Sequence, residues 1–426
     1  MKVLVVGSGA REHAICWKLR QSPRLDELFA APGNAGTAAI ATNLDMKASD
    51  LDGVCAAAKE HRIDLVIVGP EAPLAEGLAD RLRANDIAVF GPSQSAARIE
   101  SSKAFSKDLL ERYGIPTAAS RTFSSRVEAR NYIEARSGDM VVKADGLAAG
   151  KGVFMCESRE DALRAVDLMM GEEAIFGASG ATVVIEEWLK GREVSAHAFC
   201  DGKSVAPMPF SCDYKRARDR DEGQNTGGMG AYSPALWLDE ADESFISQHI
   251  TEAAVNAMAA EGAPYAGALY PGVMVTEDGP KVLEFNCRFG DPETQVLLPR
   301  LKSDLLEICW AAANGKLSEA EIEWSTDACV GVVIASGGYP DGYDTGFDIA
   351  GLGSMEEGAM VFHAGTALRD DGAVVTNGGR VLTVVATAPT LQEARGKAYR
   401  NVKLIHFTKA HYRTDIAAPA QDARVD

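Results

Sequence analysis

Short apolar runs alternate with amphipathic segments over the first hundred residues. Residues 3–6 form a run typical of a buried strand, and a glycine turn and a helix from about 12 to 19 follow it. The pattern returns at 63–68, which precedes a helix through Leu82 and another strand at 87–90. Alternation of this kind predicts an open parallel α/β sheet with helices on both faces, and we expect it to occupy residues 1–100.

The pattern changes after residue 100. Ser102 begins a predicted helix, which ends at Gly114 with Pro116 beyond it. Short strands at 140–143, 152–155, 182–187 and 194–199 then precede an amphipathic helix at about 239–260. Two further strands, at 268–276 and 280–286, flank the turn signal Asp278-Gly279. This mixture predicts an α+β unit over residues 101–320.

Strands dominate again beyond residue 327, at 330–335, 360–363 and 381–386. Thr390 and Glu393 have the spacing of a capping box, so a helix is expected to begin there. We therefore predict a β-rich α+β domain over residues 327–426.

Composition narrows the class of protein. A chain of 426 residues suggests roughly three domains. Its formal charge of −18 argues against a nucleic-acid partner, whose recognition needs a basic surface. No apolar run approaches the roughly 18 residues of a membrane-spanning helix, and the N-terminal run is too short for a signal peptide. We expect no membrane contact and no obligatory protein partner.

Cysteine and histidine are scattered along the chain. The eight cysteines include no CxxC pair, and the seven histidines form no cluster. This spacing fits neither a zinc site nor a disulfide framework, and it predicts a cytoplasmic protein with reduced thiols.

A glycine turn follows the first strand, where a dinucleotide-binding fingerprint would lie. Gly7 and Gly9 fit that fingerprint, but its third small residue would fall at Glu12. Three interpretations stay open: a structural turn, a sugar-phosphate site on the helix N-terminus with Arg11 as anion ligand, and, with least support, a nicotinamide site.

Residues 143–152 form the most informative stretch. Three residues rather than four separate Gly146 from Gly150, and Gly152 stands where a P-loop needs Ser or Thr. The flanking strands predict a glycine-rich hairpin over phosphates. Lys143 ends an apolar strand, where a half-buried ammonium is costly unless it meets an anion. The alternative is a flexible surface hairpin with a lysine that reaches water.

The strand that ends near residue 286 carries polar side chains at alternate positions. A period of two puts Glu284 and Asn286 on one face, and their oxygens suit Mg²⁺. Arg288 continues that face and could hold a transferring phosphoryl group. A solvated strand face is the alternative.

Two weaker motifs complete the set. Residues 185–189 and Glu193 could bind the adenine and the ribose of a nucleotide, or they could form an ordinary strand end. The glycine-rich loop at 225–234, after Asp213 and Lys215, lets backbone approach a ligand closely, or forms a mobile lid.

Together these stretches resemble the phosphoribosylamine–glycine ligase family of the ATP-grasp superfamily. The matching segments are residues 9–14, 32–37, 69–74, 102–105, 143–153, 225–234, 284–293 and 376–380. The resemblance implies an N-terminal substrate-binding domain, an ATP-grasp domain at 101–320 with a small strand-rich lid at about 117–190, and a C-terminal cap.

The implied reaction is ATP-dependent ligation of glycine to 5-phosphoribosylamine in de novo purine biosynthesis. Glycine would attack the γ-phosphoryl group of ATP to give glycyl phosphate, and the amine would then displace phosphate. ATP is the implied co-substrate, with Mg²⁺ or Mn²⁺. Both steps need positioning and charge neutralisation rather than an enzymic nucleophile, in agreement with a sequence that has no Ser–His or Cys–His arrangement.

The resemblance also implies roles for individual residues. The ATP site would comprise Lys103, Lys143, Gly146, Gly150, Lys151, Gly152, Glu186, Glu187, Leu189 and Glu193. The metal ligands would be Glu284 and Asn286, and the catalytic residues Arg288, Lys143, Asp213 and Lys215. The substrates would meet Gly9, Arg11, Glu12, Pro32, Gly33, Asn34, Asn225, Gly227, Gly228 and Asp291.

The chain departs from the family pattern in a few places. Tyr214 and Gln224 stand where histidine and proline are usual, which puts the contacts of the glycine-rich loop in question. The strand before Glu284 offers no second acidic metal ligand. A dehydrogenase and a non-catalytic nucleotide sensor are the competing functions, and the retained Glu284, Asn286 and Arg288 disfavour the sensor.

Overall fold

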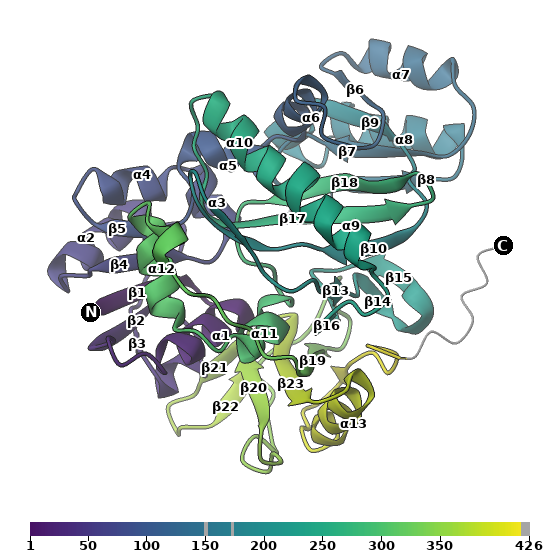
Figure 1. Cartoon of the computed structure of the whole chain (residues 1–426). Helices are drawn as coiled ribbons and strands as arrows, with labels where there is room; N and C mark the ends of the chain where they lie inside the picture. Colours follow the sequence, from purple (N-terminus) through teal and green to yellow (C-terminus); the bar gives the residue numbers. More distant parts are fainter. Residues whose placement is uncertain (149–151, 172–173, 419–426) are drawn as a thin grey trace.

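The computed structural model describes residues 1–148, 152–171 and 174–418 of the chain. The N-terminal strands form a parallel sheet in the order β3-β2-β1-β4-β5 (Figure 1). The strands are β1 (Lys2–Gly7), β2 (Glu27–Pro32), β3 (Thr42–Asn43), β4 (Leu65–Val68) and β5 (Ala88–Phe90). The accompanying helices are α1 (Ala10–Leu19), α2 (Leu51–Glu60), α3 (Glu71–Ala75), α4 (Leu78–Arg83) and α5 (Gln94–Ser101).

The predicted open parallel α/β sheet is confirmed, and its interior explains why the pattern was readable. Val3, Val5, Leu65 and Ile67 are fully buried, as strands covered on both faces must be. The predicted helix after β4 is two helices, since Gly77 lies between them with φ of 86°, a left-handed conformation that interrupts a helix.

Two sheets make up the middle of the chain. The smaller has the order β6-β9-β7-β8, and Figure 1 shows it beyond the larger sheet as seen from the N-terminal strands. Its strands are β6 (Ser120–Phe123), β7 (Met140–Ala144), β8 (Val153–Cys156) and β9 (Val183–Glu187), with helices α7 (Arg126–Glu134) and α8 (Arg159–Met170). Strands β7 and β8 pair antiparallel, with Lys143 opposite Val153, so the glycine-rich stretch between them is a hairpin as predicted.

The larger central sheet has the order β10-β17-β11-β12, and β18 pairs with β17. Its strands are β10 (Arg192–Ser195), β11 (Ala198–Asp201), β12 (Val205–Pro207), β17 (Ala266–Thr276) and β18 (Gly279–Asn286). The single strand predicted at 194–199 was wrong: β10 and β11 pair with β17 on either side of Tyr270 and Pro271. Pro271 has no N–H to donate, and the pairing on this edge of β17 is divided there between β10 and β11, whereas β18 pairs with β17 through Pro271.

Helices cover and connect these sheets. Helix α6 (Lys103–Arg112) begins at Ser102, whose hydroxyl accepts a hydrogen bond from the Phe105 N–H. The predicted helix at 239–260 is confirmed as a continuous helical segment. It consists of α9 (Glu240–Phe245), a π-helical stretch (Ile246–Glu252) and α10 (Ala253–Ala260). Helices α11 (Thr294–Leu297) and α12 (Leu305–Ala313) follow β18.

The C-terminal strands form a sheet in the order β13-β16-β19-β23-β20, with β24 on β19. Its strands are β13 (Cys212–Asp213), β16 (Gly230–Ser233), β19 (Ala328–Ser336), β20 (Ala359–His363), β23 (Arg380–Ala388) and β24 (Ala410–His411). Two hairpins, β14 (Arg216–Arg218) with β15 (Glu222–Asn225) and β21 (Thr366–Leu368) with β22 (Val374–Thr376), lie outside it. Helix α13 (Leu391–Val402) begins at the predicted capping residue Thr390.

This C-terminal sheet includes strands from the central part of the sequence. Tyr232 of β16 lies opposite Val330 of β19, so the chain on either side of residue 320 shares one sheet. The β-rich C-terminal region is confirmed, whereas the domain boundaries at 100, 320 and 327 stay predictions.

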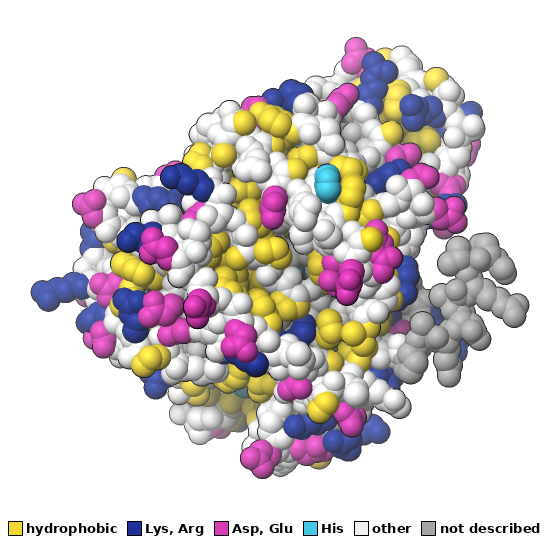
Figure 2. All heavy atoms as spheres, viewed as in Figure 1, with side chains coloured by type: hydrophobic (Ala, Val, Ile, Leu, Met, Phe, Trp, Pro, Cys, Tyr) yellow, Lys and Arg dark blue, Asp and Glu magenta, His cyan; other side chains and the backbone are white. Residues whose placement is uncertain are grey.

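The surface charges and the cysteine thiols do not point to a further functional site. Figure 2 shows Lys and Arg interspersed with Asp and Glu on the face it presents. Over the described residues, no helix is long and apolar enough to span a bilayer. In the same part of the chain all eight cysteines are free, and seven of them are buried.

Candidate active site

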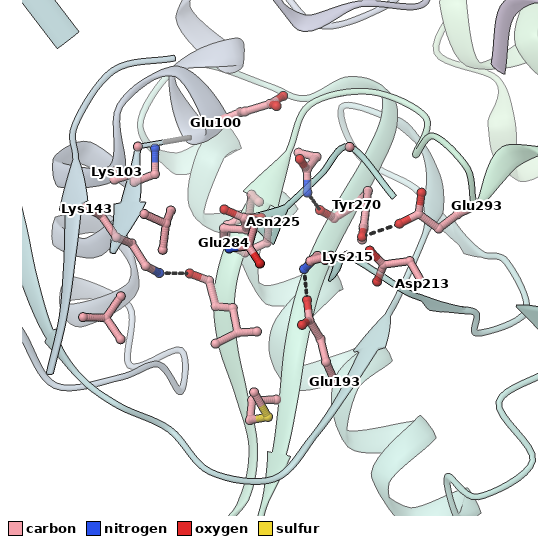
Figure 3. A pocket seen from close by; sticks show the side chains of 18 of the residues that line it. Glu100, Lys103, Lys143, Glu193, Asp213, Lys215, Asn225, Tyr270, Glu284 and Glu293 are labelled. Atoms are coloured by element: carbon pink, nitrogen blue, oxygen red, sulfur yellow. Dashed lines mark hydrogen bonds and ion pairs between the residues drawn. The ribbon is translucent and has the colours of Figure 1, made fainter. Parts of the chain in front are cut away.

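A cleft of about 930 Å³ lies between the two central sheets, the N-terminal helices and the start of β23. Figure 3 shows its side chains arranged by charge. Lys103 and Lys143 lie on one side, Glu284 lies in the middle, and Asp213 and Glu293 lie on the far side. This order is the main feature of the site.

The cationic side is built by α6 and β7. Lys103 follows the N-cap of α6, and Asp145 accepts hydrogen bonds from the Ser102 hydroxyl (3.0 Å) and the Ala104 N–H (2.7 Å). Lys143 Nζ donates to the Leu283 carbonyl at 3.0 Å and lies 2.9 Å from Glu186 Oε2. Burial lowers the pKa of Lys103, and the nearby Glu284 carboxylate opposes this shift, so the charge of Lys103 is held in the cleft at some cost.

The backbone that joins β9 to β10 forms an apolar floor beside these lysines. Glu187, Trp188 and Leu189 line the cleft. The Glu187 carboxylate accepts the Ala119 N–H at 2.9 Å and thereby fixes the end of β9. A flat base could lie against this segment, with its phosphates toward Lys103 and Lys143.

Glu284 and Asn286 line the cleft from β18, as strand periodicity predicts. Burial opposes ionisation of Glu284, yet nearby Lys215, Lys143 and Lys103 outweigh it and hold the pKa of this carboxyl below its usual value. The opposite residue, Gly272, leaves space beside the Glu284 side chain. An ionised, half-buried carboxylate next to an amide oxygen provides a suitable pair of ligands for a hard cation.

The donor set fits a hard divalent cation such as Mg²⁺ or Mn²⁺ rather than a zinc-type site of His and Cys ligands. Across the residues that the structure describes, no group of three or more His, Cys, Asp or Glu side chains could hold a metal ion. Mg²⁺ commonly takes one or two protein oxygens and completes its shell with water and substrate phosphates. Glu284 and Asn286 meet that requirement.

The far side of the cleft is rich in carboxylates. Lys215 forms an ion pair with Glu193, and the Tyr270 hydroxyl donates to Glu293 Oε1 at 2.6 Å. Burial opposes the charge of Lys215, but Glu193, Asp213 and Glu284 outweigh it and raise its pKa. Burial also raises the pKa of Asp213 to about 8; Lys215 opposes this shift, and Glu293 and Glu193 reinforce it. This side of the cleft therefore favours the arrival of a cation.

The raised pKa of Asp213 predicts a pH-dependent stability. In the unfolded chain this carboxyl has its ordinary pKa of 3.8, so folding takes up a proton between about pH 4 and pH 8. The resulting stabilisation is complete at low pH and is lost as the pH rises through 8. We expect the free energy of unfolding of the wild type, relative to Asp213→Asn, to fall by about 1.5 kcal/mol from pH 6.5 to 8.

Denaturant unfolding at several pH values measures this difference. Asp278→Asn, on the exposed turn of the β17–β18 hairpin, is the matched control and should differ from the wild type by a constant amount. A constant difference for Asp213→Asn as well would contradict the prediction.

Arg288 extends the Glu284–Asn286 face into the cleft. Its guanidinium lies 3.1 Å from Glu71 and 3.7 Å from Glu100, and Nη2 donates to Asn286 Oδ1 at 3.3 Å. Glu100 also accepts the Cys287 N–H at 2.6 Å. Two carboxylates from the N-terminal region therefore orient the guanidinium.

The N-terminal glycine turn is organised around Glu12. This carboxylate accepts the Gly9 N–H and the Arg11 Nε–H, both at 2.6 Å, and is almost fully buried. A Cβ on Gly69 would lie 1.9 Å from Glu12 Oε1, so the glycines make room for this side chain. A carboxylate therefore occupies the space that a dinucleotide's phosphates would approach, which argues against the nicotinamide interpretation.

The loop after β2 forms hydrogen bonds with the glycine turn and with the end of β20. Asn34 donates to the carbonyls of His363 (2.6 Å) and Ser8 (2.9 Å), and its Oδ1 accepts the Gly36 and Thr37 N–H groups. Its polar groups are thus satisfied by protein, and it is buried.

The cleft brings together most, but not all, of the predicted site residues. Those that line it are Arg11, Lys103, Lys143, Gly152, Glu186, Glu187, Leu189, Glu193, Asp213, Lys215, Asn225, Gly227, Glu284, Asn286, Arg288 and Asp291. Those that do not are Gly9, Glu12, Pro32, Gly33, Asn34, Gly146 and Gly228, although the Gly146 carbonyl accepts from Lys103 at 3.4 Å. Gly150 and Lys151 lie outside the described residues.

Sequence reasoning missed a group of C-terminal contacts to the glycine-rich loop. Arg380 donates to the Gly227 carbonyl (2.6 Å) and to the Asp291 carbonyl (2.8 Å), and pairs with the Asp291 carboxylate at 3.1 Å. The Tyr339 hydroxyl accepts the Gly227 N–H at 3.0 Å. The only available signal was the matching segment at 376–380, which contains Arg380.

Tyr214 and Gln224, the two residues of the loop region that depart from the family pattern, also contact the C-terminal part of the chain. The Tyr214 hydroxyl accepts the Ala417 N–H at 3.0 Å, and Gln224 Nε2 donates to Asp341 at 2.9 Å. Tyr214 and Gln224 therefore both help to hold the loop region against the C-terminal part of the chain.

Known proteins resemble the chain over nearly its whole length. Three family models match: "Phosphoribosylglycinamide synthetase, N domain" over residues 1–100, its "ATP-grasp (A) domain" over 101–294, and its "C domain" over 329–419. A phosphoribosylamine–glycine ligase of Brucella melitensis biotype 1 is 49% identical over 98% of this chain and 97% of its own.

Solved structures agree with these matches. The crystal structure of phosphoribosylamine–glycine ligase from Thermotoga maritima has a TM-score of 0.86 and 35% identity, and covers 98% of this chain and 100% of its own. A biotin carboxylase from Campylobacter jejuni, at 15% identity over 98% of this chain and 94% of its own with a TM-score of 0.75, shares the fold. The chain belongs to the phosphoribosylglycinamide synthetase family of ATP-grasp ligases.

Proposed function

We propose that the chain joins glycine to 5-phosphoribosylamine, using ATP, and forms glycinamide ribonucleotide by way of glycyl phosphate. The observation that carries the proposal is the order of charges across one cleft, from lysines through Glu284 and Asn286 to a carboxylate cluster. This order suits an anionic triphosphate at one side and an ammonium group at the other. Membership of the ligase family and the names of the relatives support it.

ATP would bind at the cationic side of the cleft. Lys103 and Lys143 would meet its phosphates, and residues 186–189 would hold the adenine, with Glu193 near the ribose. Glu284 and Asn286 would hold Mg²⁺ or Mn²⁺, which neutralises phosphate charge when bound.

Glycine would bind between the phosphates and the carboxylate cluster. Glu293 would attract its ammonium group, which would take the place of the proton that Asp213 holds below about pH 8, and the glycine carboxylate would then be directed toward Arg288 and the γ-phosphoryl group. A glycine oxygen then forms a bond to the γ-phosphorus while the bond to the β–γ bridging oxygen breaks, and ADP leaves. Arg288 stabilises the charge on the equatorial phosphoryl oxygens.

The second step needs the amine at the acyl carbon. Its nitrogen forms the amide bond as the bond from the acyl carbon to the phosphate oxygen breaks, and the nitrogen loses a proton. Phosphoribosylamine would bind at the remaining wall of the cleft, beside Arg380. This wall is formed by Arg11, Asn225, Gly227 and Asp291.

An omission experiment tests the proposed function. ADP release is measured with glycine, freshly generated phosphoribosylamine and MgATP, and again with each component left out. We expect ADP release that requires both glycine and the amine. ADP release without either substrate would contradict the proposal. Binding of ATP without turnover would also contradict it and would favour a nucleotide sensor, whereas tight nicotinamide binding would favour a dehydrogenase.

A further inference from the structure

A second buried lysine is among the residues that line the cationic side of the cleft. Lys107 is one helical turn after Lys103 on α6, is 7% exposed, and has no role in the reaction described above. Its Nζ donates to Thr117 Oγ1 at 2.7 Å and to the Ala118 carbonyl at 3.3 Å. Such complete burial of an ammonium group is costly unless its charge is matched.

The matching charge is Glu186, which Lys107 shares with Lys143. Lys107 Nζ lies 3.3 Å from Glu186 Oε1, and Lys143 Nζ lies 2.9 Å from Glu186 Oε2. Side-chain exposure in this triad is 8% or less. Two ammonium groups around one carboxylate leave one positive charge in excess, at the side of the cleft proposed for phosphates.

The pairing of β7 with β9 explains why Glu186 meets Lys143. Val141 lies opposite Glu186 in the register, so Lys143, two residues further along β7, is on the same face as Glu186. With no third group, Glu186 would cancel the charge of Lys143 and hold its side chain against the wall. Lys107 supplies the missing charge from the other side of the carboxylate.

Although Lys107 lines the cleft, its ammonium group is held by protein groups. Its two hydrogen bonds go to Thr117 and to the Ala118 carbonyl, and its ion pair goes to Glu186. Because Lys107 and Lys143 share the Glu186 carboxylate, we expect the main effect of Lys107 on a nucleotide to pass through Glu186 and Lys143.

We propose that Lys107 is a positioning residue for nucleotide binding: it offsets the charge of Glu186 and so leaves the charge of Lys143 available to the nucleotide phosphates. The inference rests on the proposed function only in taking ATP and ADP as the nucleotides. Burial lowers the pKa of Lys107 to about 8, although Glu186 opposes this shift, in agreement with a charge held at some cost.

Calorimetric binding of ADP and of adenosine tests the proposal, without glycine or phosphoribosylamine. We expect Lys107→Met to weaken ADP binding roughly tenfold, the order expected for loss of one partly screened charge near the phosphates. Adenosine, which has no phosphate, should bind within about twofold of its wild-type affinity. Lys107→Arg keeps the charge and should bind ADP within about threefold of the wild type.

A second substitution separates the effect of charge from that of structure. Adding Glu186→Gln to Lys107→Met restores the net charge of the triad, so the double variant should bind ADP at least about threefold more tightly than Lys107→Met alone. Thr117→Val removes an anchor of Lys107 without changing any charge, and it should leave ADP affinity within about threefold of the wild type.

The outcomes are distinct. No rescue by Glu186→Gln, or a loss for Thr117→Val equal to that for Lys107→Met, would show a structural anchor and overturn the proposal. Failure of the wild type to bind ADP would instead overturn the proposed function. If Lys107→Met does not fold, as thermal unfolding would reveal, Lys107→Gln removes the charge while keeping a hydrogen-bonding group.

Discussion

We expect a Glu284→Gln variant to have a kcat at least about 100-fold below that of the wild type in the complete ADP-release assay. Glu284 is the only carboxylate on the cleft face of β18, and nearby lysines keep its pKa below the usual value. The amide is nearly the same size but carries no charge, so the variant loses the anionic half of the proposed metal site while the strand keeps its shape. The apparent concentration of Mg²⁺ needed for half-maximal rate should rise as well.

The same hairpin supplies a matched control. Glu277 lies on the exposed turn between β17 and β18, so Glu277→Gln makes the same chemical change away from the cleft and should leave kcat within about twofold. Near-normal activity for Glu284→Gln, or an equal loss for the control, would contradict the assignment of Glu284 to the metal.

Where the placement of a side chain depends on local periodicity, the sequence was sufficient to predict it. The alternation that puts Glu284 and Asn286 on one face is a property of any strand, and β18 follows it. The hairpin around residues 143–153 was predictable for a similar reason, because two apolar runs flank a turn-rich stretch. Helix α13 begins where the capping residues Thr390 and Glu393 stand.

Glycine-rich turns gave a less certain prediction. Gly9, Glu12 and Asn34 were assigned to substrate, and none lines the cleft. Glu12 and Asn34 instead satisfy backbone groups of the two loops. A carboxylate or an amide beside glycines has the same sequence pattern whether it binds a ligand or braces a loop, so only the hydrogen bonds distinguish the two. Their roles in substrate binding stay predictions.

Contacts between distant residues could not be predicted at all. Arg380 reaches Gly227 across 153 positions, and Glu100 reaches Cys287 across 187. Lys107 has the appearance of a surface lysine on an amphipathic helix, and its burial follows only from packing of α6 against β9. The charges that orient Arg288 and Lys143 come from other elements, and tertiary packing decides which of them meet.

The overall charge of −18 illustrates the same limit. It predicts a surface unsuited to nucleic acid, yet the proposed ligands include two anions. A cleft can bind them because a few cations are placed next to fewer carboxylates, as in the triad of Lys107, Glu186 and Lys143. Net charge sums the whole chain, whereas ligand binding responds to charges within about a Debye length.

We expect Arg288→Lys to lower kcat by roughly 100- to 1000-fold while ADP affinity stays within about threefold of the wild type. The guanidinium is held by Glu71 and Glu100 and donates to Asn286, so its planar set of N–H donors has a fixed orientation in the cleft. Lysine keeps the charge, but its single ammonium group cannot reproduce the planar arrangement of N–H donors. If Arg288 acts on the phosphoryl group in transfer, the loss should appear in kcat and not in binding of the product nucleotide.

ADP affinity and kcat measured on the same preparations separate the possible roles of this arginine. Arg218→Lys, on the exposed β14–β15 hairpin, makes the same substitution outside the cleft and should change neither quantity by more than about twofold. A parallel fall in ADP affinity for Arg288→Lys would make this residue a ligand of the bound nucleotide, and an unchanged kcat would remove it from the reaction. A fall in kcat alone would place the guanidinium at the transferring group, because only an interaction that strengthens in the transition state lowers kcat without weakening binding.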